Sequence, residues 1–483
     1  MDAAEATTID LNLLLQQASA LVQAGNIDHG LEIFEEILKQ IPTNITALSG
    51  AGVAESLRGN HSNAINFFEK AHAEAPEEIQ ILQNLGHACM AVGLSGKARA
   101  AFEKAFNIDQ TNPEVSYWIA QLSEQMGDHL MAETFYKHSL KADPNNVQNH
   151  LQLGNALFLQ KKNLEALTVL RDAEKLFPNE TSITFLRDRL VSKSVPEWHL
   201  PMIKDISRND AFEAAIKAKV KEGDIVLDIG TGSSLLAMMA IRAGAQHVYA
   251  CEVDPILSAL AVEVIAKNGM EDKITVIPKH STALIIGDDM PQKADVLITE
   301  TFDSAIIGEG AIPSILHAHQ VLLKDNPRVI PEGATLYGAL AQCPDVRCFK
   351  EVNTVSGFDL TPMNTFTQPY SHKDTQIFFE TSEKTHAIST AFTIKQFDFE
   401  TPPEVGFQTQ SPCSIIKSGT VDVVKMWFDL QLAPGITFST EHYRSQYHWR
   451  PVTQLIRPNI VCEKGDTKTL YTNFQEYFDF TIS

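Results

Sequence analysis

The sequence contains little cysteine, and its cysteines show no regular spacing. Six of them are scattered over 483 residues, and none forms a Cys-x-x-Cys pair. Disulfide-stapled secreted domains and zinc-binding modules both need regularly spaced cysteines. We therefore expect reduced cysteines in a protein of the cytoplasm, and no metal site.

Long apolar runs and a basic leader are missing as well. No uninterrupted apolar stretch approaches the roughly 20 residues that span a bilayer. Residues 1–6, M-D-A-A-E-A, lack the basic region followed by an apolar run that marks a signal peptide. The expectation is a protein without a membrane segment.

Basic residues are scarce relative to acidic ones. Lysine and arginine number 39 against 60 aspartates and glutamates, so the formal net charge is −21. Nucleic-acid binding needs a basic face, and we therefore do not expect a nucleic acid as partner. A cationic substrate or partner is compatible with this balance. The length of 483 residues predicts several domains rather than one core.

The first third of the chain repeats with a period of 34 residues. Pro42 and Pro76 are one period apart, as are Pro144 and Pro178. Small residues, and large apolar residues four positions later, recur with the same step: Gly30, Ala64, Ala98, Ala132 and Ala166, then Phe34, Phe68, Phe102, Tyr136 and Leu170. The pattern predicts helix pairs that cross closely at the small residues and end at proline. It resembles the tetratricopeptide repeat, with five units over about residues 11–180.

Repeats of this kind stack into a solenoid with a concave face. Two uses of the array stay open at this stage. It could bind a partner protein, or it could serve only as an arm that braces a dimer.

The middle third carries the pattern of a Rossmann-like unit. Residues 225–229 read as a buried strand, and Gly230 and Gly232 allow a tight turn into a helix whose amides face a ligand. A second strand ends at Glu252, where a carboxylate could accept hydrogen bonds from ribose hydroxyls. A dinucleotide loop needs a third glycine, but Leu235 stands at that position. V-L-D-I-G-T-G is instead similar to the first motif of class I methyltransferases, in which an aspartate, here Asp228, braces the loop.

Two acidic residues bracket a short, mostly apolar loop after the strand expected at 294–299. Glu300 and Glu309 enclose T-F-D-S-A-I-I-G. Two carboxylates that lie close together in an apolar setting need a cation between them. A guanidinium is planar, permanently charged and rich in donors, so it is the natural guest. The alternative is that both acids simply face water.

These motifs together resemble the protein arginine methyltransferases from about Trp198 to the end of the chain. M-I-K-D-I-S-R-N, beginning at Met202, resembles the family's first helix, and E-T-F-D-S-A-I-I-G-E resembles its double-glutamate loop. Y-H-W-R-P at 447–451 resembles its Thr-His-Trp loop. Residues 267–282 and 307–319 are most similar to the monomethylating, type III branch.

The resemblance implies a role for each site residue and S-adenosyl-L-methionine as the cofactor. The catalytic residues would be Glu300, Glu309, His448 and Asp205, with Asp205 supporting His448. The substrate pocket would be lined by Met202 and Trp449. The cofactor would be held by Arg208, Asp228, Gly230, Gly232, Glu252 and Ser281, with Arg208 on its carboxylate.

The sequence departs from the family pattern at several positions. Ser234 replaces the last glycine of the cofactor loop, Tyr447 replaces a threonine, and Thr282 and Ala283 stand near the place of a glutamate that reads adenine. The related proteins with repeats carry two catalytic modules, whereas this sequence has one. One module implies a homodimer, and residues 355–360 fall in the region of the family's dimerisation arm.

We therefore expect a multi-domain chain. Its parts would be an all-α repeat solenoid at 1–190, an α/β Rossmann-like domain at 191–331, and a β-barrel at 332–483, where apolar and polar residues alternate in short runs. The expected activity is monomethylation of arginine in a protein or peptide. The same chemistry on free arginine or a small guanidine is the first alternative, and a non-catalytic scaffold is the second.

Overall fold

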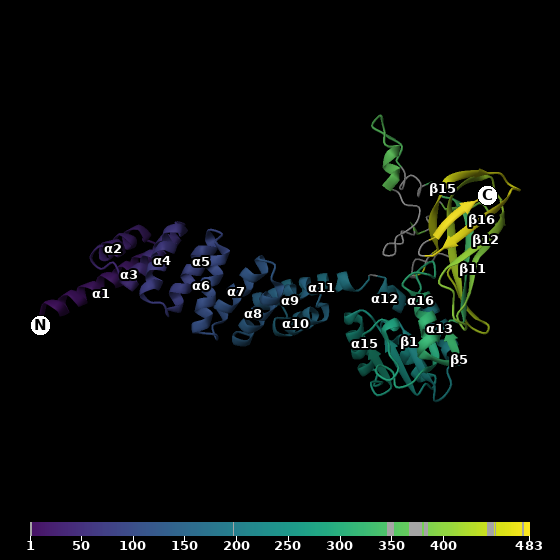
Figure 1. The fold of residues 1–483 in the computed structure, drawn as a ribbon, viewed down its shortest axis with the longest axis horizontal. Coiled ribbons are helices and arrows are strands. Elements are labelled where there is room, and N and C mark those ends of the chain that lie inside the picture. The colour runs from purple at the N-terminus through teal and green to yellow at the C-terminus, as the bar shows by residue number, and fades with distance from the viewer. Residues whose placement is uncertain are drawn as a thin grey trace. The chain divides into compact units, whose positions relative to one another are not determined.

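A computed structural model describes residues 2–196, 198–344, 352–366, 379–380, 385–441, 449, 451–475 and 478–483. The chain divides into two compact units, Met1–Lys193 and Ser194–Ser483 (Figure 1). The described part of the first unit is helical, and the described strands all lie in the second. None of the described helices is both long and apolar enough to cross a membrane.

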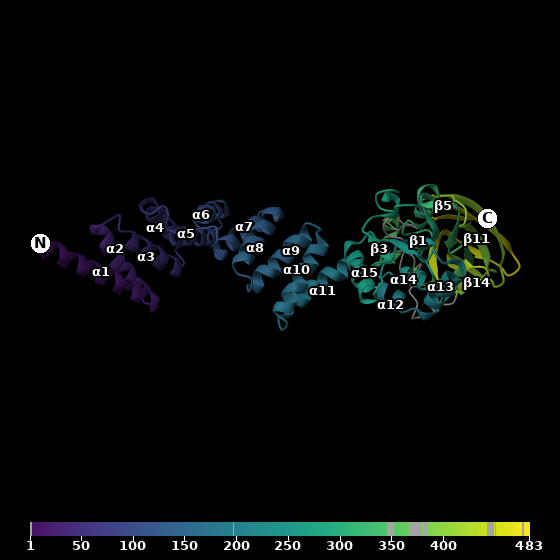
Figure 2. The same cartoon turned by 90° about the horizontal axis from the view of Figure 1, so that it is seen from below.

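The first unit is an array of helix pairs followed by one further helix. Its elements are α1 (Asp2–Gln23), α2 (Ile27–Gln40), α3 (Ile45–Leu57), α4 (His61–Glu74), α5 (Ile79–Ala91), α6 (Ser95–Ile108), α7 (Pro113–Gln125), α8 (His129–Ala142), α9 (Val147–Leu159), α10 (Asn163–Leu176) and α11 (Thr181–Ser194). Figures 1 and 2 show successive pairs stacked against each other. The predicted repeat array is confirmed.

Small residues allow the helices of a pair to cross closely, as the period predicts. A Cβ added at Gly86 would lie 2.5 Å from the Phe102 ring, which is closer than van der Waals contact allows. The turns between paired helices also follow the period, with positive φ at Gly25, Gly59, Gly93 and Gly127. At the fifth turn Lys161 adopts the same left-handed conformation, with φ 61°.

The second unit begins with a five-stranded parallel sheet of order β3-β2-β1-β4-β5. The strands are β1 (Ile225–Ile229), β2 (His247–Cys251), β3 (Ile274–Ile277), β4 (Ala294–Thr299) and β5 (Leu323–Ile330). The helical segments are α12 (His199–Ile203), α13 (Ile206–Lys219), α14 (Leu235–Arg242), α15 (Pro255–Lys267), η1 (Ser281–Ala283), α16 (Ala311–His317) and η2 (Ala318–Leu322). All residues of β1 are buried, as expected for a central strand covered on both faces. The predicted Rossmann-like domain is confirmed.

The C-terminal part is antiparallel and forms separate sheets. A seven-stranded sheet contains β6 (Gly333–Gln342), β9 (Phe379–Glu380), β10 (His386–Ala387), β11 (Phe392–Asp398), β13 (Gly419–Ala433), β14 (Ile436–Ser439) and β15 (Val452–Cys462). A three-stranded sheet contains β12 (Phe407–Ser414), β16 (Thr467–Phe474) and β17 (Phe478–Ile482). A short hairpin, β7 (Thr354–Val355) with β8 (Phe358–Asp359), precedes η3 (Thr361–Phe366).

The predicted β-barrel is not confirmed. Within the described residues, β12, β16 and β17 pair only with one another, so no closed barrel forms. Alternating apolar and polar residues predict that a segment is a strand with one buried face, but they do not predict which edges pair.

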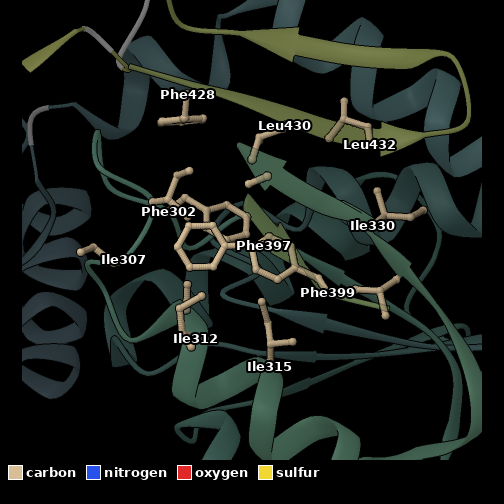
Figure 3. Close-up of a cluster of buried hydrophobic side chains, with 14 of the residues drawn as sticks. Phe302, Ile307, Ile312, Ile315, Ile330, Phe397, Phe399, Phe428, Leu430 and Leu432 are labelled. Carbon is tan, nitrogen blue, oxygen red and sulfur yellow. The ribbon is translucent and has the colours of Figure 1, made fainter. Parts of the chain in front are cut away.

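One apolar core joins the parallel sheet to the antiparallel sheets. Phe302 stacks on Phe399 with ring centroids 5.6 Å apart, and Ile315 of α16 belongs to the same core as Phe428 and Leu430 of β13. Figure 3 shows these side chains converging between the two parts. The loop that follows β4 is therefore anchored through Phe302 in a core that both the parallel and the antiparallel sheets contribute to.

Overpacking should reveal the close helix crossing in the repeat array. Gly86→Ala places a methyl group against the Phe102 ring, so we expect it to lower the free energy of unfolding by about 1–3 kcal/mol. Gly96→Ala is the matched control, because Gly96 lies in α6 with open space around it and should be neutral or slightly stabilising. Urea unfolding followed by circular dichroism measures both. Equal midpoints for the two variants would refute the close crossing.

Candidate active site

A cavity of about 320 Å³ opens where the parallel strands end. Ligands of open α/β sheets bind at the carboxyl ends of the strands, and this volume lies in the range of ligand sites, about 300–1,000 Å³. Residues that follow β1, β2 and β4 line it. Of the predicted site residues, the lining includes Met202, Arg208, Gly230, Gly232, Glu252, Ser281, Glu300 and Glu309.

The glycine loop after β1 has the backbone conformation that its sequence predicts. Gly230 and Gly232 have φ values of +72° and +51°. A Cβ at Gly230 would lie 2.3 Å from the Thr301 side chain, so the loop and the segment after β4 are in close contact. Ser234, which replaces the family's glycine, also adopts a left-handed conformation with φ 59°. Serine at this position therefore adopts the positive φ that glycine would, although a residue with a Cβ disfavours this conformation.

Asp228 lies behind this loop and fastens it. Its carboxylate accepts a hydrogen bond from the Thr231 hydroxyl at 2.6 Å, and the Thr231 and Ser234 hydroxyls are 3.2 Å apart. Asp228 is buried, and this burial, together with the nearby charge of Glu252, raises its pKa to about 7 against the effect of the Thr231 hydrogen bond. The bracing contact predicted for Asp228 is present.

Glu252 connects the end of β2 to the same loop. One carboxylate oxygen accepts the Gly232 amide at 3.0 Å, and the other accepts the Asp254 amide at 2.9 Å. Burial raises the pKa of Glu252. A carboxylate offers about four acceptor sites, more than these backbone amides use, and Glu252 lines the cavity, so ribose hydroxyls could bind it.

Two buried polar atoms in the cavity wall lack a partner among the described residues. They are the hydroxyl oxygen of Ser281 and Nε of Arg208. A buried polar group without a hydrogen bond costs about 1–3 kcal/mol, so such atoms point to a polar ligand. Together with the glycine loop and Glu252, they fit a nucleoside ligand that also carries a carboxylate, as S-adenosyl-L-methionine does.

Arg208 forms a buried ion pair with Glu300. Its Nη2 donates to Glu300 Oε2, and its Nη1 donates to Asn209 Oδ1 at 2.8 Å. The guanidinium also lies over the Phe212 ring, 5.3 Å from the centroid. Both side chains of the pair are about 95% buried, with exposed fractions of 4% and 5%. The sequence predicted both residues but not their pairing, so a guanidinium of the protein itself already contacts one of the two expected clamp residues.

The loop between Glu300 and Glu309 has an unusual backbone. Ile306, Glu309 and Gly310 have φ values of 74°, 55° and 73°. Positive φ is rare for a β-branched residue and costs of order 1–3 kcal/mol, so the surrounding structure must impose it. Such strain often accompanies function.

Glu309 lines the cavity without a partner of its own. No hydrogen bond or ion pair to its side chain is found within the described parts of the chain. A large fraction of the surface of the residue is accessible to solvent. Even so, the surrounding protein partly desolvates its carboxyl, and the negative charges of Glu300 and Asp303 add to this effect. Together they raise the pKa of Glu309 to about 7. The site therefore holds more negative charge than its own cations balance.

Three predicted residues lie beside the cavity rather than in its wall. Asp205 is the N-cap of α13, where it accepts the Arg208 amide at 3.1 Å. Trp449 is buried against Phe428 and Phe438, and its indole N–H donates to the Phe302 carbonyl at 2.7 Å. Trp449 thus supports the loop after β4 instead of lining the cavity. Asp228 is the third, and His448 lies outside the described residues.

The sequence did not single out Asp303, which the structure places at the centre of the same loop. Its carboxylate accepts the backbone amides of Ala305 and Gly308 at 3.0 and 3.1 Å. The Asp-Ser-Ala order is typical of a turn in which an aspartate bonds to the amide two residues later. The turn sequence at 303–305 could therefore have indicated this role of Asp303.

Substitution of Gly230 tests the contact between the glycine loop and Thr301. Gly230→Ala should weaken S-adenosylhomocysteine binding at least about tenfold, because the added methyl displaces the loop from the segment after β4. Gly269→Ala is the matched control, since Gly269 has a positive φ of 66° but open space around it. Isothermal titration calorimetry measures both affinities. An unchanged affinity in Gly230→Ala would contradict this geometry.

Regions of the helical array, the parallel sheet and the antiparallel sheets each match a known protein family. Residues 332–475 match the arginine methyltransferase oligomerization subdomain, and residues 212–309 match the ribosomal protein L11 methyltransferase (PrmA) family. Residues 57–122 and 113–146 match tetratricopeptide repeats. In chain order, these matches fall on the middle of the helical array, on the parallel sheet without β5, and on the antiparallel sheets without β17.

Curated relatives and a solved structure agree with these families. The chain is 34% identical over 297 residues to the arginine N(omega)-methyltransferase of Streptomyces achromogenes, covering 61% of this chain and 80% of that protein. It is 33% identical over 337 residues to protein arginine N-methyltransferase 9 of Mus musculus, covering 63% of this chain but only 40% of that protein. The Trypanosoma brucei PRMT1 enzyme-prozyme complex with AdoHcy shares the fold at a TM-score of 0.52 and 20% identity, over 58% of this chain and 89% of that one. The chain therefore belongs to the protein arginine methyltransferase family.

Proposed function

We propose that this chain is an S-adenosyl-L-methionine-dependent methyltransferase that acts on a guanidino nitrogen of arginine. One observation carries the proposal. Glu300 and Glu309 line the same cavity as the glycine loop and Glu252, so a guanidinium and a nucleoside cofactor could bind next to each other. The surplus of carboxylates favours cationic ligands in that cavity.

The residues that would hold the cofactor fit its parts. The backbone at Gly230 and Gly232 would approach it closely, Glu252 would accept its ribose hydroxyls, and Ser281 would bond its nucleoside end. Arg208, which has an unused buried donor, would bind its carboxylate. When bound, the cofactor supplies an electrophilic methyl group on a sulfonium.

Glu300 and Glu309 would orient the substrate. A guanidinium is protonated at neutral pH and is a weak nucleophile, because its lone pairs are delocalised. Charge-assisted hydrogen bonds to two carboxylates would draw positive charge toward the held nitrogens and leave the attacking nitrogen richer in electrons. The same bonds would fix the attack geometry, from which much of the rate enhancement arises.

The attacking nitrogen must also lose a proton. Glu309, whose pKa without substrate is about 7, lines the cavity beside the expected guanidinium and would be the first acceptor. The resemblance adds His448, supported by Asp205, as a second acceptor. Substrate binding also has to displace Arg208 from Glu300 or share the carboxylate with it, so a carboxylate ligand on Arg208 would prepare Glu300 for the substrate.

We propose arginine in a protein or peptide as the substrate and monomethylarginine as the product. The similarity of residues 267–282 and 307–319 to the type III branch supports this choice. A second candidate, free arginine, is supported by the bacterial relative named arginine N(omega)-methyltransferase, of which the chain covers 80%. The repeat array would either capture a protein partner or brace a dimer.

We also propose a homodimer in the cytoplasm. The segment at 352–366 contains the hairpin of β7 and β8 and the helical turn η3. It exposes apolar side chains: Val355, Phe358 and Met363 are 46%, 71% and 50% exposed. It lies inside the match to the oligomerization subdomain. Exposed apolar residues gathered in one segment favour burial against another protein surface.

Glu300→Gln tests the clamp. The glutamine can still accept a hydrogen bond from Arg208, but it removes the charge that would hold the substrate, so we expect methyl transfer to fall about 100-fold. S-adenosylhomocysteine affinity should stay within about twofold, and Glu271→Gln, an exposed residue before β3, should behave like the parent. Transfer of labelled methyl to an arginine-rich peptide and to free arginine, with mass analysis of products, measures activity and substrate class together. If Glu300→Gln transfers methyl groups at the rate of the unsubstituted protein, Glu300 does not hold the substrate. If the unsubstituted protein binds no S-adenosylhomocysteine, the chain is a non-catalytic scaffold.

Phe358→Asp tests the dimer. A charge in the exposed apolar segment should convert the dimer to a monomer, because it must be desolvated in the interface. Phe185→Asp is the matched control, since Phe185 is 70% exposed on α11 and Phe358 is 71% exposed. Sedimentation equilibrium gives both masses. A parent that is monomeric throughout the micromolar range contradicts the proposal.

A further inference from the structure

The double-glutamate loop contains a third carboxylate with no place in the proposed mechanism. Asp303 does not line the cavity, so the mechanism above gives it no contact with the substrate. Its hydrogen bonds instead run to the backbone of its own loop. By area Asp303 is half-buried, so its carboxylate adds a negative charge beside the two clamp carboxylates.

Asp303 closes the loop through three hydrogen bonds. Its carboxylate oxygen Oδ1 accepts the amides of Ala305 and Gly308, and its carbonyl accepts the amide of Ile306 at 3.0 Å. The side chains of Ala305 and Ile306 are fully buried in the core. Ile306 is therefore held in its left-handed conformation from two sides, by the turn and by its own packing.

Gly308 shows how closely the carboxylate fits. A Cβ added there would lie 2.4 Å from Asp303 Oδ2 and 2.5 Å from its Cγ. Only glycine leaves room for Asp303 at this point, so the glycine is required by space. Since Gly308 immediately precedes Glu309, the contact fixes the chain at the residue before the second clamp carboxylate.

The charge of Asp303 acts on the same neighbour. Asp303 is one of the negative groups that raise the pKa of Glu309, after desolvation and Glu300. Burial raises its own pKa to about 6, although the two amides oppose this. The other charged or titratable groups that line the cavity are His199, Arg208, Cys251, Glu252, Asp254, Lys279, His280 and Glu300.

We propose that Asp303 is a positioning residue that holds the loop before Glu309, and so Glu309 itself, in place through its bonds to the backbone of Ala305, Ile306 and Gly308. Asp303 acts through the loop backbone and through its charge, without touching the substrate. The role rests on the proposed function, because Glu309 matters only if it binds a guanidinium.

Asparagine and alanine separate the two effects. Asp303→Asn keeps an oxygen that can accept both amides but removes the charge. We expect kcat within about threefold of the parent, and an acid limb of kcat/KM displaced to lower pH, because Glu309 loses a nearby negative charge and ionises more readily. Asp303→Ala removes both amide acceptors, so KM for the arginine substrate should rise and kcat should fall, each at least tenfold. Gly308→Ala should resemble Asp303→Ala, since it expels the carboxylate.

Amide hydrogen exchange measures the loop without relying on activity. Peptides covering residues 300–311 should exchange at least tenfold faster in Asp303→Ala and Gly308→Ala, and at the parental rate in Asp303→Asn. S-adenosylhomocysteine affinity should remain parental and so verify the fold, and Asp325→Ala, an exposed residue of β5, is the control. Parental exchange and kinetics in Asp303→Ala would overturn the proposal, as would an Asp303→Asn variant as impaired as alanine with an unshifted pH profile. If the parent transfers no methyl group to arginine, the proposed function fails, while the exchange data still decide whether Asp303 holds the loop.

Discussion

The active site depends on an excess of carboxylates kept in a poorly solvated cavity. Asp228, Glu252, Glu300, Asp303 and Glu309 gather around the ends of β1, β2 and β4, and the buried ion pair to Arg208 balances only one of these charges among the described residues. Desolvation, and after it the neighbouring negative charges, raise the pKa values of Asp228 and Glu309 to about 7. A cation lowers this electrostatic cost, and the proposed reaction brings two, a sulfonium and a guanidinium.

The fold maintains this arrangement by holding the loop after β4 from several directions. The glycine loop lies against Thr301, Trp449 donates to the Phe302 carbonyl, and the Phe302 ring stacks on Phe399 in the shared core. The antiparallel domain therefore contributes to the site without lining the cavity at these positions. The positive φ values of Ile306 and Glu309 persist because neighbouring elements impose them.

Much of the fold and part of the site could be predicted from the sequence. The 34-residue period, the turn at Gly230 and Gly232, and the presence of Glu300 and Glu309 on one loop depend on local order, and local order is visible in a sequence. The Arg208–Glu300 pair joins residues 92 positions apart, and no local pattern indicates it. Trp449 was assigned to the substrate pocket by resemblance, yet its hydrogen bond reaches a backbone carbonyl 147 residues away. The β-barrel is not confirmed in the described residues, and the sequence could not decide it, because strand edges pair through tertiary structure.

Proton release on substrate binding tests the central claim most directly. Glu309 has a pKa raised to about 7, so part of its carboxyl is protonated near neutral pH, and a guanidinium bound against it should lower that pKa. Calorimetric titration of the S-adenosylhomocysteine-bound protein with an arginine-rich peptide and with free arginine, in buffers of different ionisation enthalpy, counts the protons. We predict a net release of protons on binding that is larger at pH 6 than at pH 8. Binding without proton release, or no binding of either ligand, would contradict a guanidinium held by Glu300 and Glu309.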